Sequence, residues 1–157
     1  MAGGRFGATV VIDRPIEEVF AYLADGENDA TFSERVLEIK QTTDGPPGVG
    51  TIYASTVKDA GVKFKREFKI SEFEPPTKIR WTEISTGPVI TPEGGYDLAP
   101  TGEGKTQLSF YNVIEGRTLI GKVVVGPALR SARKGADDFA RAIKAAIEAE
   151  PRPPIVA

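Results

Sequence analysis

The feature that most constrains the fold of this chain is a long amphipathic run near its C-terminus, from Thr118 to Glu150. From Leu129 onward, apolar residues recur at intervals of three and four, which predicts one buried stripe along a helix. The stripe consists of Leu129, Ala132, Ala136, Phe139, Ala140, Ile143, Ala146 and Ile147. A helix of this length spans about 45 Å, so it must lie along something wide.

Two further features of this run concern the surface beneath it. Gly126-Pro127 predicts a kink, because proline cannot donate the helical hydrogen bond. Small residues cluster in the first half of the stripe, at Ala128, Ala132, Gly135 and Ala136. They allow either a close approach to the neighbouring layer or a hollow that receives a guest molecule. In the second case the apolar segment 119–125, before the kink, would border the entrance.

Composition removes several classes of function. The chain has 157 residues, the usual size of one domain, and its 20 basic and 22 acidic residues give no reason to expect a nucleic-acid partner. Cysteine and histidine are both absent, which excludes disulfides, thiolate nucleophiles and Ser-His-Asp catalysis. We expect neither a metal nor a cofactor. The sequence has no signal-like or membrane-spanning apolar run, so we expect a cytoplasmic protein without membrane insertion.

The chain before the long helix is predicted to form mostly strands. Alternating residues predict a first strand over 6–12, and an apolar stripe after Pro15 predicts a helix that ends at Asp25-Gly26. A second helical turn is expected over 27–32. Six strands follow, separated by turns rich in glycine and proline: 35–43, 51–58, 62–73, 78–86, 89–98 and 105–115. This order predicts an α+β domain with antiparallel neighbours, and the proline-rich segment 150–157 reads as a tail.

Several short sequence segments resemble those of a known family. They are Val10 to Phe20, Leu23-Ala24-Asp25, Gly48-Val49-Gly50-Thr51, Tyr96 with Leu98, Thr106 and the final helix, while Phe32 stands where the family often has tryptophan. The chain resembles the START-type helix-grip (SRPBCC) superfamily, in its polyketide cyclase/dehydrase-like branch. The resemblance covers about residues 5–149. It implies a single START-like domain over 1–157: a curved seven-stranded antiparallel sheet grips the long helix, with two short helices between strands one and two and an apolar cavity inside.

Members of this superfamily include lipid carriers, hormone-binding proteins, aromatase/cyclases and dehydratases, so the resemblance does not select an activity. The site must therefore come from side chains that point inward. Val62, Phe64, Arg66, Phe68 and Ile70 share the apolar face of one strand, which places a guanidinium on the buried side.

Glu83 on the next strand shares a face with Ile79 and Trp81 and is predicted to lie diagonal to Arg66. This pair is either a structural ion pair or a catalytic one, and Arg66 could instead extend its head to water at the sheet edge. Trp81 and the phenylalanines fit a packed core or a stacking surface. Tyr53 and Tyr96 fit either a core with a hydrogen-bond partner or contact with a ligand.

Two functions remain from this reasoning. The first is the binding of a small apolar or amphipathic molecule, such as a lipid, in an internal cavity of about a few hundred Å³. The expected lining is Tyr53, Ser55, Phe64, Arg66, Phe68, Trp81, Glu83, Tyr96, Phe110, Asn112, Ala132, Ala136 and Phe139. The alternative is a cyclase or dehydratase acting on a polyketide-like substrate, with Glu83 as general base and Arg66 or a tyrosine stabilising an oxyanion. A weaker possibility is a protein-binding module that uses the outer sheet face, where a homodimer could also form.

Overall fold

The computed structural model describes residues 2–59, 61–102 and 104–151. Seven strands form one sheet: β1 (Gly3–Ile12), β2 (Val36–Gln41), β3 (Ile52–Asp59), β4 (Val62–Glu74), β5 (Lys78–Glu83), β6 (Val89–Pro100) and β7 (Thr106–Gly116). Two short helices, α1 (Ile16–Ala24) and the 3₁₀ helix η1 (Gly26–Thr31), lie between β1 and β2, and α2 (Leu119–Glu148) ends the described fold. Most of the predicted tail lies outside the described residues.

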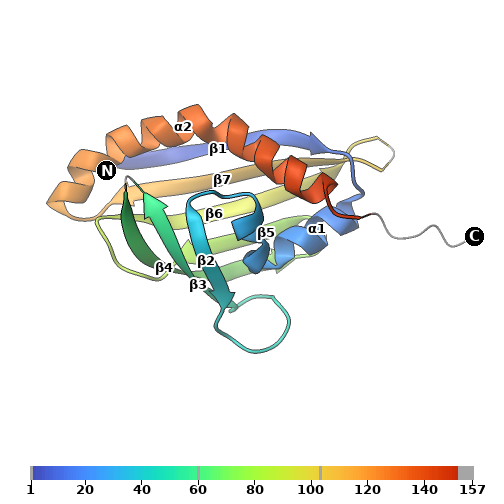
Figure 1. Ribbon diagram of the computed structural model, residues 1–157, viewed down its shortest axis with the longest axis horizontal. Helices are drawn as coiled ribbons and strands as arrows, with labels where there is room; N and C mark the ends of the chain where they lie inside the picture. The colour runs from blue at the N-terminus through green and yellow to red at the C-terminus, as the bar shows by residue number, and fades with distance from the viewer. Residues whose placement is uncertain (1, 60, 103, 152–157) are drawn as a thin grey trace, which may run out of the picture.

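The sheet has the order β1-β7-β6-β5-β4-β3-β2, and every neighbouring pair is antiparallel. Strands β2 to β7 are each paired with the next strand in the sequence, and the last strand, β7, also pairs with the first, β1 (Figure 1). The predicted helix-grip architecture is confirmed. One strand was predicted too long: 78–86 was expected, but β5 ends at Glu83.

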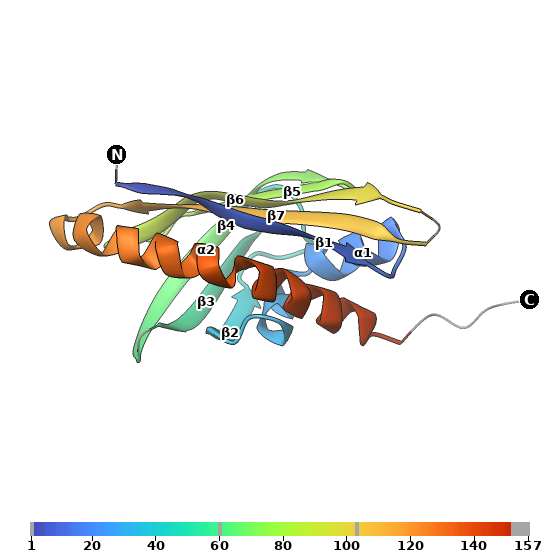
Figure 2. The ribbon, with the colours of Figure 1, turned by 90° about the horizontal axis from the view of Figure 1, so that it is seen from above.

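Three register shifts interrupt the pairing: one between Val36 and Glu38, one between Ile70 and Glu72, and one between Ile90 and Glu93. A bulge bends its strand and increases the local twist, so three of them help to curve the sheet. Figure 2 shows the result, with β2, β3 and β4 turning away from the plane of β1 and β7. The sheet therefore has a concave face, which we call the inner face.

Helix α2 lies along the inner face over β1, with fewer contacts to β7 and fewest to β6 (Figures 1 and 2). Thr118 caps it, because its hydroxyl accepts a hydrogen bond from the Gly121 amide at 2.9 Å. Gly121 lies so close to the chain at Pro88 that a Cβ there would approach the Pro88 carbonyl oxygen to 1.8 Å. A glycine is therefore required where the first turn of the helix meets the sheet.

The predicted stripe of α2 is confirmed: Leu129, Ala136, Ala140, Ile143 and Ile147 are buried, and Ala132, Phe139 and Ala146 are partly buried. Two of the small residues were placed wrongly, because Ala128 and Gly135 are exposed and do not face the sheet. The helix is continuous through Pro127. Whether the helix bends there stays a prediction.

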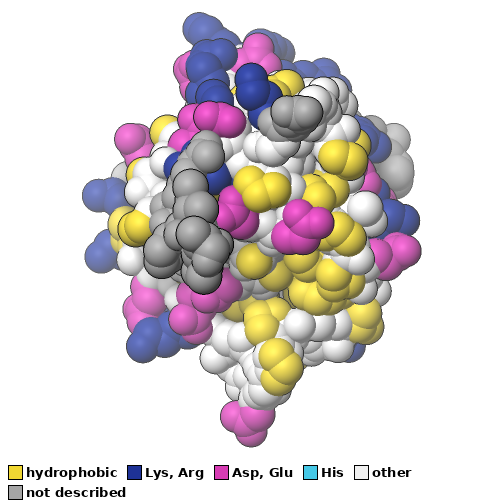
Figure 3. All heavy atoms as spheres, turned by 90° about the vertical axis from the view of Figure 1, so that its right-hand side faces the viewer, with side chains coloured by type: hydrophobic (Ala, Val, Ile, Leu, Met, Phe, Trp, Pro, Cys, Tyr) yellow, Lys and Arg dark blue, Asp and Glu magenta, His cyan; other side chains and the backbone are white. Residues whose placement is uncertain are grey.

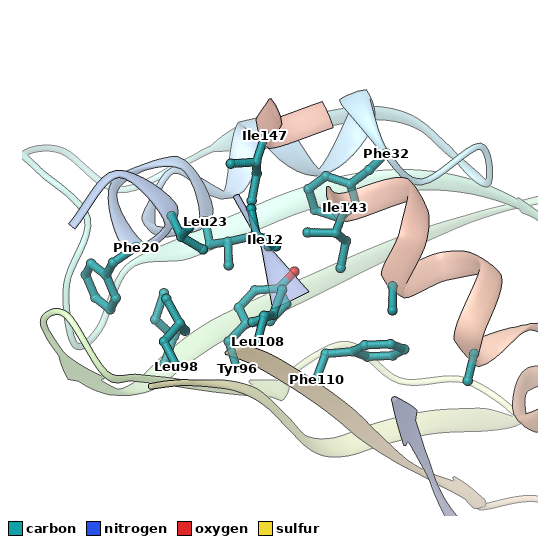
Figure 4. Close-up of a cluster of buried hydrophobic side chains, with 14 of the residues drawn as sticks. Ile12, Phe20, Leu23, Phe32, Tyr96, Leu98, Leu108, Phe110, Ile143 and Ile147 are labelled. Atoms are coloured by element: carbon teal, nitrogen blue, oxygen red, sulfur yellow. The ribbon is translucent and has the colours of Figure 1, made fainter. Parts of the chain in front are cut away.

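The core lies between the inner face, α1 and the second half of α2. Figure 4 shows Ile12, Leu98, Leu108 and Phe110 on strands, facing Phe20 and Leu23 of α1 and Ile143 of α2. The end of the molecule that carries α1 and the C-terminal end of α2 shows a gathering of apolar side chains on its surface (Figure 3). Within the described part of the chain, no helix is both long and apolar enough to cross a membrane.

Ile143→Ala should lower the free energy of unfolding by about 2–5 kcal/mol, because Ile143 is 0% exposed in the core. The matched control is Ile120→Ala on the same helix, where the side chain is 71% exposed and its loss should cost less than about 0.5 kcal/mol. Urea unfolding of both variants gives the comparison. Equal losses would contradict the packing of α2 described above.

Candidate ligand-binding face

The cross-strand register places the predicted strand residues on the inner face together. Residues directly opposite each other on neighbouring strands share a face: Tyr53 with Phe68, Ser55 with Arg66, Phe68 with Glu83, and Tyr96 with Phe110. Trp81 lies opposite Gly94, which lies opposite Asn112. The alternation visible in the sequence thus assigned these side chains to the correct side.

Arg66 and Glu83 form a buried, bidentate ion pair on this face. Nε of Arg66 donates to Oε2 of Glu83 at 3.1 Å, and Nη2 donates to Oε1 at 2.6 Å. The Glu83 side chain is 3% exposed and that of Arg66 is 21% exposed. Because Glu83 lies opposite Phe68, it is diagonal to Arg66, as the sequence predicted. Arg66 does not extend to water at a sheet edge, so that alternative is wrong.

The bulge in β6 completes the surroundings of Glu83. Thr91 and Pro92 fall in the register shift between Ile90 and Glu93, and Pro92 is tolerated there because it has no ladder hydrogen bond to lose. The freed Thr91 amide donates to Oε1 of Glu83 at 2.7 Å, and its hydroxyl accepts from Nη2 of Arg66 at 3.0 Å. Ser85 donates to Oε2 of Glu83 at 2.6 Å.

The hydrogen bonds to both carboxylate oxygens of Glu83 determine which chemical roles this residue can have. Burial favours the neutral acid, but the hydrogen bonds from Arg66, Ser85 and Thr91 together outweigh it and hold the pKa of Glu83 below its ordinary value. A general base near neutral pH needs a raised pKa and a free oxygen aimed at the substrate. Glu83 has neither, so the predicted role as general base is not supported.

Trp81 and Asn112 form a second polar contact on the inner face. The indole Nε1 donates to Oδ1 of Asn112 at 3.0 Å, and the indole ring packs edge-on against Tyr96 at 4.9 Å between centroids. A Cβ at Gly94 would lie 2.1 Å from the Asn112 oxygen and 2.2 Å from the indole nitrogen. Gly94 therefore leaves the space in which these two side chains meet across β6.

Aromatic side chains on the inner face divide into two groups. Tyr53, Tyr96 and Phe110 are buried in the core. Phe68, Trp81 and Phe139 are only partly buried, and Phe64 is 43% exposed, although all four point inward. The reason is the position of α2: it packs against β1 and β7 and leaves the inner face of β4 less covered.

One acidic residue at this face was not identified from the sequence. Asp29 lies on η1, in which residues three apart lie on one side, and both Gly26 before it and Phe32 after it face inward. Tyr53 supports this helix, since its hydroxyl accepts from the Gly26 amide at 3.1 Å and donates to the Ala24 carbonyl at 3.3 Å. The three-residue spacing between Asp29 and the apolar Phe32 could have predicted that Asp29 faces inward. The many acidic residues of this segment instead suggested a fully exposed turn.

The surroundings of Asp29 raise the pKa of its carboxyl group far above the ordinary value. Asp29 is partly exposed as a residue, and partial burial of its carboxyl group together with the charge of Asp25 raises its pKa to about 7. Asp29 also raises the pKa of both Tyr53 and Tyr96, in each case after the larger effect of burial. Its charge therefore acts on both phenols of the inner face.

Comparison with known proteins assigns the family. A family model described as polyketide cyclase/dehydrase and lipid transport matches residues 4–148, almost the whole chain. The chain belongs to this family. The resemblance inferred from its sequence phrases is thereby confirmed. A search of curated protein sequences found no match.

Solved structures of this polyketide cyclase/dehydrase fold agree at low sequence identity. The ZhuI aromatase/cyclase from Streptomyces sp. R1128 is 17% identical, with a TM-score of 0.75 over 93% of this chain and 94% of that one. A START superfamily protein from Mycobacterium smegmatis is 16% identical, with a TM-score of 0.75 over 93% and 98%. The di-domain aromatase/cyclase StfQ from the steffimycin pathway is 15% identical, with a TM-score of 0.73 over 94% and 51%. At these identities the likeness establishes the fold alone.

Two hollows of this family member lie near the two ends of α2. One, of about 450 Å³, is open to solvent beside Ala2, Gly116 and Lys122. The other, of about 40 Å³ beside Arg14, Tyr22 and Ile147, has room for a water or two. Neither is the cavity expected beneath the middle of α2, so that cavity stays a prediction. Among the described residues, no group of three or more acidic side chains is placed to hold a metal ion.

Glu83→Gln should destabilise the fold at neutral pH by on the order of 3 kcal/mol, because it leaves Arg66 partly buried without a charged partner. The lowered pKa of Glu83 fixes the sign of the pH dependence. Its stabilisation is complete above the unfolded value, about 4.3, and is lost as pH falls through the lower folded value. Urea unfolding from pH 7 downward should show the two proteins converging. Glu38→Gln, at an exposed 4.0 Å pair with Lys40, is the control and should change little.

Asp29→Asn should have the opposite effect. A raised folded pKa means that ionisation of Asp29 costs stability, with no cost below the unfolded value of about 3.9 and the full cost above about 7. The variant should therefore gain on the order of 1 kcal/mol or more over the native chain at alkaline pH and nothing near pH 4. Thermal unfolding across this pH range, with the exposed Asp44→Asn as control, measures it. A pH-independent difference would contradict the raised pKa of Asp29.

Proposed function

We propose that this chain binds a small apolar or amphipathic molecule on the inner face, between α2 and strands β3 to β6. The observation that carries the proposal is the partial exposure of inward-pointing Phe64, Phe68, Trp81 and Phe139. Large apolar side chains on a concave face gain free energy when a ligand removes them from water, at about 25 cal/mol per Å². Pockets lined in this way, with a few polar groups among them, are the usual form of small-ligand sites.

The polar groups suit an amphipathic guest. Arg66 keeps 21% of its side chain exposed despite its pairing with Glu83, and its guanidinium lies 5.0 Å from the centre of the Phe68 ring. Asn112 is fixed by Trp81, which leaves its amide NH₂ to donate elsewhere. Apolar contact would supply affinity, and these groups would fix the orientation of the guest.

The entrance is proposed at the end of the molecule where α2 begins and the β3–β4 hairpin turns (Figures 1 and 2). The first turns of α2 expose Leu119, Ile120, Val123 and Val124 by 84%, 71%, 75% and 43%. Val62 and Phe64, at the start of β4, are 53% and 43% exposed. Exposed apolar side chains gathered at one place mark binding sites more often than chance positions on a surface.

An enzyme of the cyclase or dehydratase type is the second candidate. What favours it is the likeness in fold to aromatase/cyclases. The arrangement around Glu83 weakens it, because that carboxylate is saturated and the chain has no histidine to replace it. We therefore place binding first.

A blocking substitution tests the location of the site. Trp81 is the only tryptophan of the chain, so its emission reports on the inner face during titration with oleate, anthraquinone or cholesterol. Ala132→Phe fills space beneath α2 and should weaken binding at least about tenfold. Ala128→Phe, one turn earlier on the exposed side, should leave affinity unchanged.

If both phenylalanine variants bind like the native chain, the guest does not lie beneath α2. If the native chain binds none of the three compounds, by Trp81 emission and by native mass spectrometry, the binding proposal fails. Urea unfolding of Ala132→Phe shows whether weaker binding reflects a blocked site or a lost fold.

A further inference from the structure

The Tyr96 hydroxyl is buried and has no partner among the described residues. Tyr96 is 6% exposed, and Figure 4 shows its oxygen pointing away from β6 toward the layer of Ile12 and Ile143. Every fully enclosed side-chain nitrogen or oxygen in the described part of the chain has a hydrogen-bond partner. Because no described group hydrogen-bonds the Tyr96 hydroxyl, this oxygen must touch space that water can enter.

Asp29 lies on η1, which packs on the same face of the sheet: Gly26 abuts the Tyr53 ring, and Phe32, just after η1, packs against Phe139. Its charge raises the pKa of Tyr96 after the larger effect of burial, and no hydrogen bond joins the two side chains. The Asp29 carboxylate likewise has no hydrogen-bond partner among described residues and is not fully enclosed. A carboxylate and a buried phenol that make no hydrogen bond to described residues need partners from elsewhere, either water or part of a ligand.

We propose that Asp29 and Tyr96 form the polar end of the ligand site and bind the hydroxyl group of a neutral, otherwise apolar molecule. This inference rests on the proposed function and adds the chemical class of its ligand. A hydroxyl group donates one hydrogen bond and accepts others, so it can donate to the Asp29 carboxylate and accept from the Tyr96 hydroxyl at once. A carbonyl oxygen only accepts and cannot satisfy an ionised Asp29.

The neighbouring charges exclude an anionic head group at this position. The ionisable groups that act on Tyr53, Tyr96 and Asp29 are Asp25, Glu27 and Asp29 itself, all acidic. A carboxylate such as that of a fatty acid would meet like charges at short range, which disfavours binding. The ligand class that fits is a phenol, an enol or an alcohol on an apolar body.

Binding should then depend on pH. The pKa of Asp29 is raised to about 7 by burial and by Asp25, while Tyr53 and Tyr96 on the facing strands stay neutral near this pH because their own pKa values are raised. A hydrogen bond to a carboxylate is stronger than one to a neutral acid. A hydroxylated ligand should therefore bind more tightly above pH 7 than below it.

The test uses two probes of nearly equal shape, 2-naphthol and 2-methylnaphthalene, with dissociation constants from isothermal titration calorimetry. The native chain should prefer 2-naphthol by about tenfold above pH 7, and this preference should decline with a midpoint near pH 7. Asp29→Leu and Tyr96→Phe should each remove most of the preference while the affinity for 2-methylnaphthalene is retained. Asp29→Asn should remove the pH dependence, and Asp44→Asn, on an exposed loop, should change neither quantity.

The outcomes separate the two proposals. Retained binding of 2-methylnaphthalene in every variant shows that the folded site is intact. Equal affinity of the native chain for both probes, or a preference that survives Asp29→Leu and Tyr96→Phe, overturns the role of this pair and leaves the binding function standing. Failure of the native chain to bind either probe overturns both.

Discussion

The packing of α2 along β1 and β7 is the contact on which the rest of the structure depends. It buries one stripe of the helix, from Val125 to Ile147, against the first and last strands of the sheet. A helix of this length covers only part of a curved sheet, so the strands that bend away keep an inner face that the helix does not fully cover. The same contact that closes the core at one end thus leaves aromatic side chains accessible at the other.

The ion pair of Arg66 and Glu83 shows how a charge is kept on that inner face. An isolated guanidinium there would be costly, and Glu83, Thr91 and Phe68 together supply its partners. These contacts lower the pKa of Glu83 and make it unsuitable as a general base. Asp29 differs, because burial and the charge of Asp25 raise its pKa. The pKa of Glu83 is therefore lowered and that of Asp29 raised by their different surroundings. Such opposite shifts often distinguish structural from functional carboxyl groups.

Local patterns were sufficient for most of the fold. Strand alternation assigned Arg66, Trp81 and Tyr96 to the inner face, and the helical period identified the stripe of α2, because both periodicities follow directly from backbone geometry. Errors arose where a neighbouring element decided the outcome. Ala128 and Gly135 are exposed because they lie outside the part of α2 that packs on the sheet, and a run of small residues does not show where that contact ends.

By itself, the sequence determined the order of elements, the family, the side of the sheet on which the candidate residues lie, and the diagonal placement of Glu83 relative to Arg66. Only the tertiary structure decided what those residues can do. Protonation depends on partners brought from distant segments: the β6 bulge delivers the Thr91 amide to Glu83, whereas Asp29 on η1 has no such partner among the described residues. The pKa of a carboxyl group reflects its burial and its neighbours in space, and neither can be read from its neighbours in sequence.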